Sequence, residues 1–263
     1  MSALLFFDID GTLITLDKKH EMPESTKRAL YKAKEKGHKI FINTGRVKTA
    51  IDSHLLEFGF DGLVCGCGSY IEYEGKEIFH HTLTKEQCAT YAQWLKECKF
   101  HTMFEGRDRL FIDGAHGPGS FLEYIYEYFS ENSQYPIEEI DHPAFIFDKF
   151  TTCKFEESDG ELFQKYFEKD FNLIPHTSNI IEAVPFGLSK ATGIQYVMDY
   201  LKVPLENCYA FGDSVNDMEM LSFVKHSIGM GNAMQPVLDI VDYVTTSVLE
   251  DGIENALKHY ELI

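Results

Sequence analysis

Two aspartates separated by one residue, Asp8 and Asp10, come directly after the apolar run of residues 4–7. A short apolar run that ends in turn residues is typical of a buried strand in a parallel sheet. In open α/β sheets, ligands bind beyond the carboxyl ends of such strands. Two carboxylates crowded there would repel each other unless a cation neutralised them, so the motif favours a hard metal such as Mg²⁺. The alternative, an ordinary Asp-Gly turn after a strand, stays open on this motif alone.

A second pair of carboxylates follows another apolar run, residues 208–211. The segment Gly212-Asp213-Ser214-Val215-Asn216-Asp217 comes next and opens a helical pattern. Asp213 and Asp217 therefore belong to a second predicted strand end, where Ser214 and Asn216 offer further polar groups. Together with the first motif, this segment predicts four acidic side chains at strand ends.

Two further segments offer groups that bind anions. Thr44 and Gly45 follow the apolar run of residues 39–42 and precede a helical pattern. A hydroxyl and free backbone N–H groups at a helix start favour an anion there. Lys190 follows Ser189, a suitable helix N-cap. A single lysine in a first helical turn is more often a solvated surface charge, but nearby strand-end acids weaken that interpretation.

In this order and spacing, the four motifs resemble the haloacid-dehalogenase-like superfamily of phosphohydrolases, and within it the Cof-type sugar-phosphatase-like group. The resemblance covers nearly the whole chain, and Gly229-Met230-Gly231-Asn232-Ala233 looks like the usual continuation of that group. The first and fourth motifs are specific together, whereas the other two gain meaning from their order. One departure is Cys67-Gly68-Ser69, where relatives commonly show Asn-Gly-Ala. Because that loop lies near the cap entry in the family, the departure bears on substrate preference.

The resemblance implies an aspartyl-phosphate mechanism. Asp8 is expected to attack phosphorus, and Asp10 to protonate the leaving oxygen and later activate water. Mg²⁺ is expected to be held by the carboxylates of Asp8 and Asp213 and the backbone carbonyl of Asp10, with Asp217 orienting a metal-bound water. The carboxylic acid at position 10 favours a hydrolase, because the superfamily's ion-pumping ATPases carry threonine at the matching position.

The resemblance also implies a cradle for the transferred phosphate. The groups expected to hold its oxygens are Thr44, the Gly45 backbone, Lys190 and Asn216, and Lys190 is counted with the two aspartates as catalytic. The expected substrates are small phosphorylated metabolites, such as sugar phosphates or phosphorylated cofactors, hydrolysed as phosphoric monoesters. Two alternatives stay open: a phosphomutase on the same core, and a non-catalytic regulatory protein that binds phosphorylated ligands.

The alternation of strand and helix patterns predicts an α/β fold with a doubly wound parallel sheet. From about residue 84, short strands joined by turns suggest an antiparallel sheet instead. We therefore expect a Rossmann-like core formed by residues 1–83 and 186–263, with an inserted α+β cap domain at 84–185. Within this scheme, a helix is expected at 47–58, strands at 144–148 and 151–155, and a helix at 121–129.

Composition narrows the possible partners. The formal net charge of −18 over 263 residues argues against nucleic acid or anionic membrane as a partner. No segment approaches the roughly 20 apolar residues of a membrane span. The six cysteines lack metal-binding spacing. Because neither a signal peptide nor a membrane span fits the sequence, a cytoplasmic protein with reduced thiols is expected. The glycines 114, 117 and 119 are interpreted as a plain loop, Arg107 and Arg109 as solvated or substrate-facing, and the oligomeric state is left open.

Overall fold

The computed structural model describes residues 2–17, 20–113, 123, 126–127 and 136–263. It divides into two compact units. The first comprises Met1–Gly45, Phe60–Ile78 and Ser189–Ile263, and the second comprises Arg46–Gly59 and Phe79–Leu188. The second unit is thus inserted into the chain of the first, and it takes residues 46–59, 79–83 and 186–188 that the sequence grouped with the first.

The first unit contains an eight-stranded sheet, whose last strand continues across the boundary between the units. Its elements are β1 (Leu4–Phe7), α1 (Glu24–Glu35), β2 (Lys39–Asn43), β3 (Gly62–Cys65), β4 (Tyr70–Tyr73), β5 (Lys76–His80), α6 (Lys190–Leu201), β12 (Cys208–Gly212), α7 (Met218–Phe223), β13 (His226–Gly229), α8 (Gln235–Leu238), β14 (Tyr243–Val244) and α9 (Gly252–His259).

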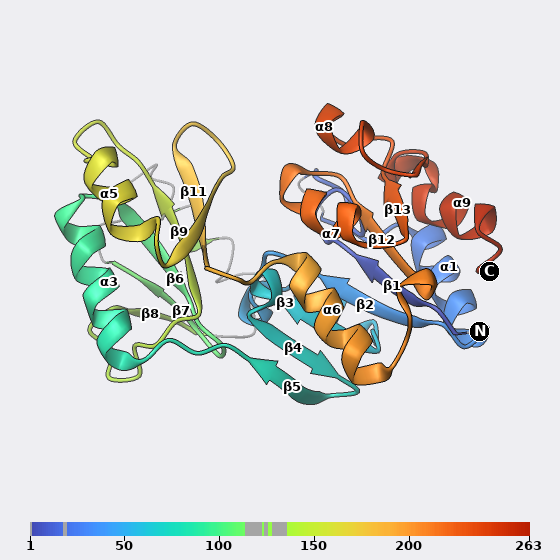
Figure 1. Ribbon diagram of the computed structural model, residues 1–263, viewed down its shortest axis with the longest axis horizontal. Coiled ribbons are helices and arrows are strands. Elements are labelled where there is room, and N and C mark those ends of the chain that lie inside the picture. Colours follow the sequence, from blue (N-terminus) through green and yellow to red (C-terminus); the bar gives the residue numbers. More distant parts are fainter. Residues whose placement is uncertain (1, 18–19, 114–122, 124–125, 128–135) are drawn as a thin grey trace. The chain divides into compact units, whose positions relative to one another are not determined.

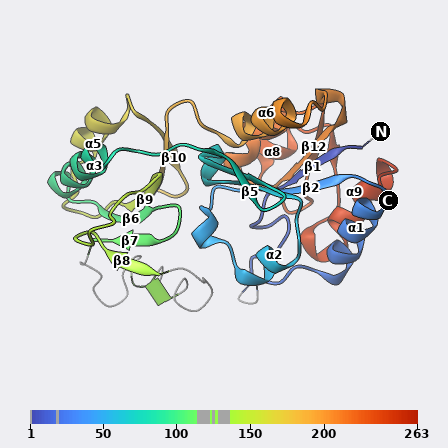
Figure 2. The same cartoon turned by 90° about the horizontal axis from the view of Figure 1, so that it is seen from below.

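The strand order is β14-β13-β12-β1-β2-β3-β4-β5 (Figure 1). The strands from β14 to β3 are parallel, and β4 runs antiparallel to β3. Helix α1 packs against α9, and α6 packs against α7. Figures 1 and 2 show α6 on one face of this sheet and α1 with α9 on the other. All four side chains of β1 are buried, as expected for a central strand covered on both faces. The doubly wound α/β fold is therefore confirmed.

The second unit is built on a six-stranded sheet in the order β10-β11-β9-β6-β7-β8. Its elements are α2 (Ser53–Glu57), α3 (Lys85–Glu97), β6 (His101–Glu105), β7 (Leu110–Ile112), β8 (Ile137–Glu139), β9 (Lys149–Cys153), α5 (Gly160–Phe167), β10 (Phe171–Pro175) and β11 (Ile180–Pro185). Neighbouring strands are antiparallel except β7 and β8. Helices α3 and α5 cover one face through an aromatic core that includes Phe104, Phe150 and Phe163.

The opposite face of this sheet buries a charged cluster. Glu105, Lys149 and Glu182 come from the adjacent strands β6, β9 and β11 and alternate with core residues. The Lys149 ammonium lies 2.9 Å from Glu105 Oε1 and 2.7 Å from Glu182 Oε1. Thr151 donates to Glu105, and His176 Nε2 lies 2.8 Å from Glu182 Oε2. Each charged group of the cluster therefore has an opposite charge or a hydrogen-bonding partner beside it, as burial of charge requires.

Some expected elements differ from those in the structure. The helix expected at 47–58 is interrupted, because Ile51 and Asp52 have extended backbone angles. Val47 and Ala50 instead pack with Met103, which explains why this segment groups with the second unit. The strand expected at 144–148 is wrong: Phe145, Ile146 and Phe147 pack in the aromatic core and form no strand, and a single strand, β9, replaces the two expected ones.

Part of the expected organisation lies outside the described residues. This applies to the glycine cluster at 114, 117 and 119 and to most of the helix expected at 121–129. Within the part of the chain that the structure does describe, no helix has the length and apolar character needed to cross a bilayer. All six cysteines are buried thiols.

Candidate active site

The acidic motifs meet at the carboxyl edge of the eight-stranded sheet. Asp8 follows β1, and Asp213 follows β12, the strand that pairs with β1 in parallel. Thr44 follows β2, which pairs with the other side of β1. The backbone N–H of Asp8 donates to the carbonyl of Phe211 at 3.0 Å, which extends the β1–β12 pairing up to the first aspartate.

Three of these carboxylates form one compact group. Carboxylate oxygens of Asp8, Asp213 and Asp217 all lie within 4.8 Å of one another, and all three residues are buried. Such a set of hard oxygen donors suits a cation of the Mg²⁺ type. The side chain of Asp10 lies outside this group, although its charge is close enough to act on Asp8 and Asp213.

Lys190 lies inside the acidic group rather than on the surface. Its ammonium nitrogen is 2.6 Å from Asp8 Oδ1 and 2.6 Å from Asp217 Oδ1, and the residue is only 1% exposed. Lys190 begins α6, where Ser189 caps the helix by accepting from the N–H of Thr192. A cation at a helix N-terminus opposes the helix dipole, so the two carboxylates are what stabilise the charge there. The interpretation of Lys190 as a solvated lysine is therefore wrong.

Asp217 is held by both of its oxygens. While Oδ1 binds Lys190, Oδ2 accepts the backbone N–H groups of Asp213 and Ser214 at 2.9 and 3.0 Å. A Cβ added at Gly212 would lie 2.7 Å from the side chain of Asp217, so only glycine fits beneath it. These contacts fix the Asp217 carboxylate at one place beside the other acids.

The turn after Asp8 is equally constrained. Gly11 has a φ of 76°, and a Cβ at this position would collide with the carboxylate of Asp213. The Thr12 hydroxyl donates to Asp213 Oδ1 at 3.3 Å, and Asp10 forms a β-bridge with Ile14. The glycine of the first motif is therefore needed both for its backbone conformation and for the close approach of Asp213.

Burial and mutual repulsion set the charges of the site. Burial raises the pKa of Asp8 well above its usual value, against the attraction of Lys190, and the other aspartates add to the rise. Burial and the charge of Asp217 raise the pKa of Asp213 to about 7. Burial alone would lower the pKa of Lys190, but Asp217 and Asp8 outweigh it and raise that pKa. One ammonium does not balance these carboxylates, so the donor set fits an added divalent cation.

The expected phosphate-binding residues lie around the same edge. Thr44 is buried, its N–H donates to Val64, and its carbonyl accepts from the N–H of Cys67. Cys67 has left-handed backbone angles, with φ 52° and ψ 45°. Asn216 Oδ1 accepts from the Ser214 hydroxyl at 2.6 Å. Gly45 follows Thr44 directly and is the last residue of the first segment of this unit.

Sequence reasoning missed the role of two residues that support the site. Thr12, two residues after Asp10, donates from its hydroxyl to Asp213, a contact that the sequence pattern did not indicate. Asn232 donates from Nδ2 to the carbonyl of Gly11 at 2.9 Å. Its position in the Gly-Met-Gly-Asn-Ala segment was the only signal, and that signal gave no indication of its contact.

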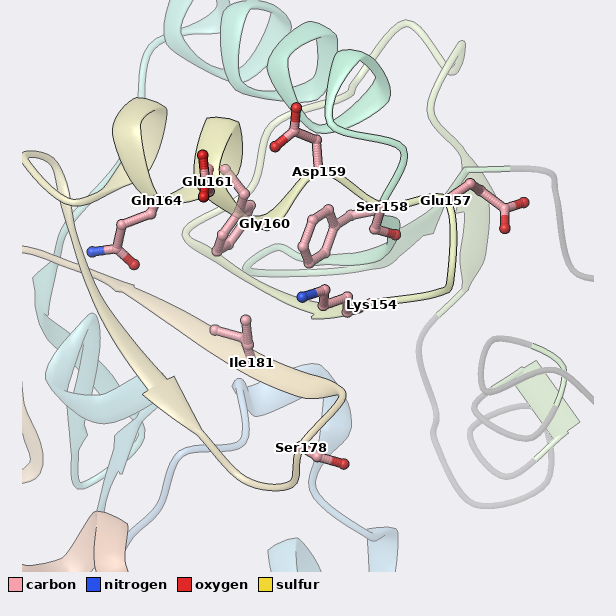
Figure 3. Close-up of a pocket in the computed structure, with 11 residues that line it drawn as sticks. Lys154, Glu157, Ser158, Asp159, Gly160, Glu161, Gln164, Ser178 and Ile181 are labelled. Atoms are coloured by element: carbon pink, nitrogen blue, oxygen red, sulfur yellow. The ribbon is translucent and has the colours of Figure 1, made fainter.

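Two cavities are lined by residues of the second unit, and none of the three clustered aspartates lines either of them. The larger, of about 830 Å³, lies beside the start of α5 (Figure 3). Its walls include one base, Lys154, and three acids, Glu157, Asp159 and Glu161, so it does not favour an anionic substrate. The smaller, of about 470 Å³, is lined by eight residues, which are His80, Lys85, Arg107, Asp108, Pro143, Ala144, Ile146 and Asp148. It contains Arg107, whereas Arg109 donates to Asp108.

Comparison with known proteins agrees with this geometry. Residues 5–257 match the model of the haloacid dehalogenase-like hydrolase family. YkrA of Bacillus subtilis (strain 168), which carries a provisional phosphatase name, is 32% identical over 100% of this chain and 99% of its own. The HMP-PP phosphatase of Klebsiella pneumoniae (strain 342) is 26% identical over 99% of this chain and 94% of its own.

A solved structure also points to a phosphatase. The HAD subclass IIB sugar phosphatase BT4131 superposes with a TM-score of 0.83 at 28% identity, over 100% of both chains. These matches confirm the expected family and the expected enzyme class, a phosphoric monoester hydrolase. The chain therefore belongs to the haloacid dehalogenase-like hydrolase family, as one of its Cof-type phosphatases.

Proposed function

We propose that this protein is a Mg²⁺-dependent phosphatase that hydrolyses small phosphorylated metabolites through an aspartyl-phosphate on Asp8. The observation that carries the proposal is the contact of one buried ammonium, that of Lys190, with Asp8 and Asp217 inside a group of three carboxylates. The site thus brings together a carboxylate that can act as nucleophile, an ammonium and carboxylates that can bind a metal ion. Phosphoryl transfer requires these groups side by side.

In the first step, a carboxylate oxygen of Asp8 attacks phosphorus. A new O–P bond forms while the bond from phosphorus to the ester oxygen breaks. Asp10 gives its proton to that departing oxygen, which leaves as an alcohol. In the second step, Asp10 takes a proton from water, and the resulting hydroxyl displaces Asp8, which regenerates the free carboxylate and releases inorganic phosphate.

The remaining residues hold the phosphate and the metal. We assign Thr44, the Gly45 backbone, Asn216 and Lys190 to the phosphate oxygens, where fixed donors stabilise the charge that develops. Residues assigned to Mg²⁺ are Asp8, Asp213, the Asp10 carbonyl and, through water, Asp217. When bound, the metal supplies positive charge that lets an anionic nucleophile approach an anionic phosphate.

We further propose the sequence-based division into a core at 1–83 and 186–263 and a cap at 84–185. The cap is the proposed reader of the part of the substrate beyond its phosphate, because a covering domain excludes water and large molecules. The names of two relatives, a sugar phosphatase and an HMP-PP phosphatase, support a small phosphorylated molecule as substrate. All six cysteines are thiols, which supports the proposed cytoplasmic location.

The test is a phosphate-release screen over a library of phosphorylated metabolites, with Mg²⁺ and with a chelator in parallel. Wild-type protein is expected to release phosphate only with the metal. Asp8→Asn should abolish turnover, and Asp10→Asn should slow it by about 10²- to 10⁴-fold. Phosphate release by a pure Asp8→Asn protein at the wild-type rate would refute the proposal.

Two further assays on the same library separate the alternatives. A phosphomutase would convert a sugar phosphate to its isomer, which a coupled assay for the isomer detects without free phosphate. A non-catalytic regulator would bind a phosphorylated ligand in calorimetric titration and release nothing. Either result would replace the phosphatase assignment.

A further inference from the structure

Asn232 connects two loops at the active edge through its side-chain amide. It lies in the loop after β13, where Nδ2 donates to the carbonyl of Gly11 at 2.9 Å. Its Oδ1 accepts from the backbone N–H of Val248, also at 2.9 Å. The residue itself is exposed, but both hydrogen bonds are partly buried. The amide thus joins its own loop to two other segments, to the turn of the first motif through Nδ2 and to the segment that begins at Val248 through Oδ1.

The turn that Asn232 contacts is the one that carries Asp10. The N–H groups of Thr12, Leu13 and Ile14 all donate to the carbonyl of Ile9, and the N–H of Gly11 donates to Ile14. These bonds close the turn internally. The Gly11 carbonyl is not among the acceptors of these bonds, and it accepts from Asn232.

The loop of Asn232 is held in place without its side chain. Backbone N–H groups of Met230, Gly231 and Met234 donate to Gly212, Thr246 and Asp213, at 3.0, 3.1 and 2.8 Å. The side-chain amide is therefore not needed to fix its own loop. What it adds is a tie from that fixed loop to the carbonyl of Gly11, the residue directly after Asp10.

We infer that Asn232 is a positioning residue that holds Asp10 in place for proton transfer, acting through the Gly11 carbonyl. This inference rests on the proposed function, in which Asp10 protonates the departing oxygen. Gly11 has a φ of 76°, a conformation in which glycine has wide backbone freedom. A bond to the Gly11 carbonyl therefore limits the backbone orientations of this residue. Because Asp10 directly precedes Gly11, the same bond limits where the Asp10 carboxylate lies.

The test compares Asn232 with Asn255, an asparagine in helix α9. Asn232→Ala removes the bonds to Gly11 and to Val248. The matched control, Asn255→Ala, removes two bonds made by Nδ2, to the Thr246 hydroxyl at 2.8 Å and the Glu250 carbonyl at 3.1 Å, and neither touches the first motif. Asn232→Asp serves as a second variant, because it keeps the acceptor for Val248 and loses the donor to Gly11. Thermal unfolding shows whether each variant is folded.

The decisive readout is the dependence on the leaving group. An alkyl phosphate needs a proton on its departing oxygen, whereas an aryl phosphate with an acidic phenol needs it far less. Asn232→Ala and Asn232→Asp should lower kcat for the alkyl phosphate at least about tenfold, with a much smaller change for the aryl phosphate and in KM. Asn255→Ala should leave both unchanged. An equal fall on both substrates, or no fall, would overturn the inference.

A second readout does not depend on catalysis. Deuterium exchange of the peptide that contains residues 9–14 should be faster in Asn232→Ala than in wild type and in Asn255→Ala. Unchanged exchange would refute the tie to the first motif. If wild-type protein releases no phosphate from any substrate, the proposed function fails, and exchange alone still decides whether Asn232 fixes this turn.

Discussion

The ammonium nitrogen of Lys190 lies 2.6 Å from Asp8 Oδ1, although the two residues are 182 positions apart in the chain. Both side chains are almost fully buried, and Asp217 accepts from the same ammonium. A pair that is excluded from water in this way depends strongly on both partners, because removal of one leaves the other charge buried and uncompensated.

Lys190→Met should therefore destabilise the protein as well as inactivate it. We expect a loss of about 3–5 kcal/mol in the free energy of unfolding near neutral pH, measured by chemical denaturation without divalent metal. The control is Lys258→Met, which removes a surface lysine paired with Glu254 and should lose at most about 1 kcal/mol. Equal losses in the two variants would contradict the buried pair.

Gly11→Ala should damage the site more than a matched glycine substitution elsewhere. Gly11 and Gly75 have nearly the same backbone angle, with φ of 76° and 74°. A Cβ at Gly11 meets the Asp213 carboxylate, whereas at Gly75 nothing lies within 4 Å. Both variants should lose about 1–2 kcal/mol of stability from the left-handed conformation. Only Gly11→Ala should also lower kcat, by about 100-fold, because it displaces catalytic groups. Similar phosphate-release rates in both variants would argue against this role of the turn.

Two buried cysteines separated by one residue should respond differently to valine. Cys67 has a φ of 52°, in the left-handed region that β-branched residues avoid, whereas Cys65 has a φ of −112°. Cys67→Val should lower the free energy of unfolding by at least about 1–2 kcal/mol more than Cys65→Val. Parallel thermal and urea unfolding of the two variants tests this, and an equal loss would show that the loop adapts freely.

The charged cluster of the second unit should produce a pH-dependent stability. Burial would raise the pKa of Glu182, but Lys149 and His176 outweigh it and hold that pKa below the usual 4.5. A carboxyl with a lowered pKa stabilises the fold above its unfolded pKa, and this contribution is lost as the pH falls. Burial raises the pKa of Glu105 despite Lys149, so this residue contributes with the opposite sign.

Lys149→Met leaves both carboxylates buried without their shared cation. We expect a loss of about 3–5 kcal/mol near pH 7, shrinking toward about pH 4 as the carboxylates take up protons. Urea unfolding of both proteins across this pH range measures the difference. A loss that is the same at both ends of the range would rule out the charge-based explanation.

The sequence predicted the arrangement of the core because local patterns determine it. Uninterrupted apolar runs gave the strands that end at Asp8, Thr44 and Asp213, and parallel pairing then places their ends at one edge. The helix break at Ile51 and Asp52 was missed because it accompanies packing of Val47 and Ala50 against the distant Met103. Such long-range contacts leave no periodic signal in a single sequence.

The contacts that support the site could not be predicted from local sequence patterns either. Asn232 reaches Gly11 across 221 positions, and nothing near either residue indicates the partner. The contact of Lys190 with Asp217 was likewise hidden, since a first-turn lysine ordinarily faces water. Tertiary hydrogen bonds of this kind depend on where two loops meet, which is decided by the whole fold.

The insertion of residues 79–188 between the two large segments of the first unit affects how the protein is made. Asp8 leaves the ribosome early, whereas Lys190, Asp213 and Asp217 are synthesised only after the entire inserted unit. A nascent chain that stops before Lys190 has Asp8 but not the ammonium that lies beside it in the finished fold. The acidic group therefore stays incomplete throughout most of translation.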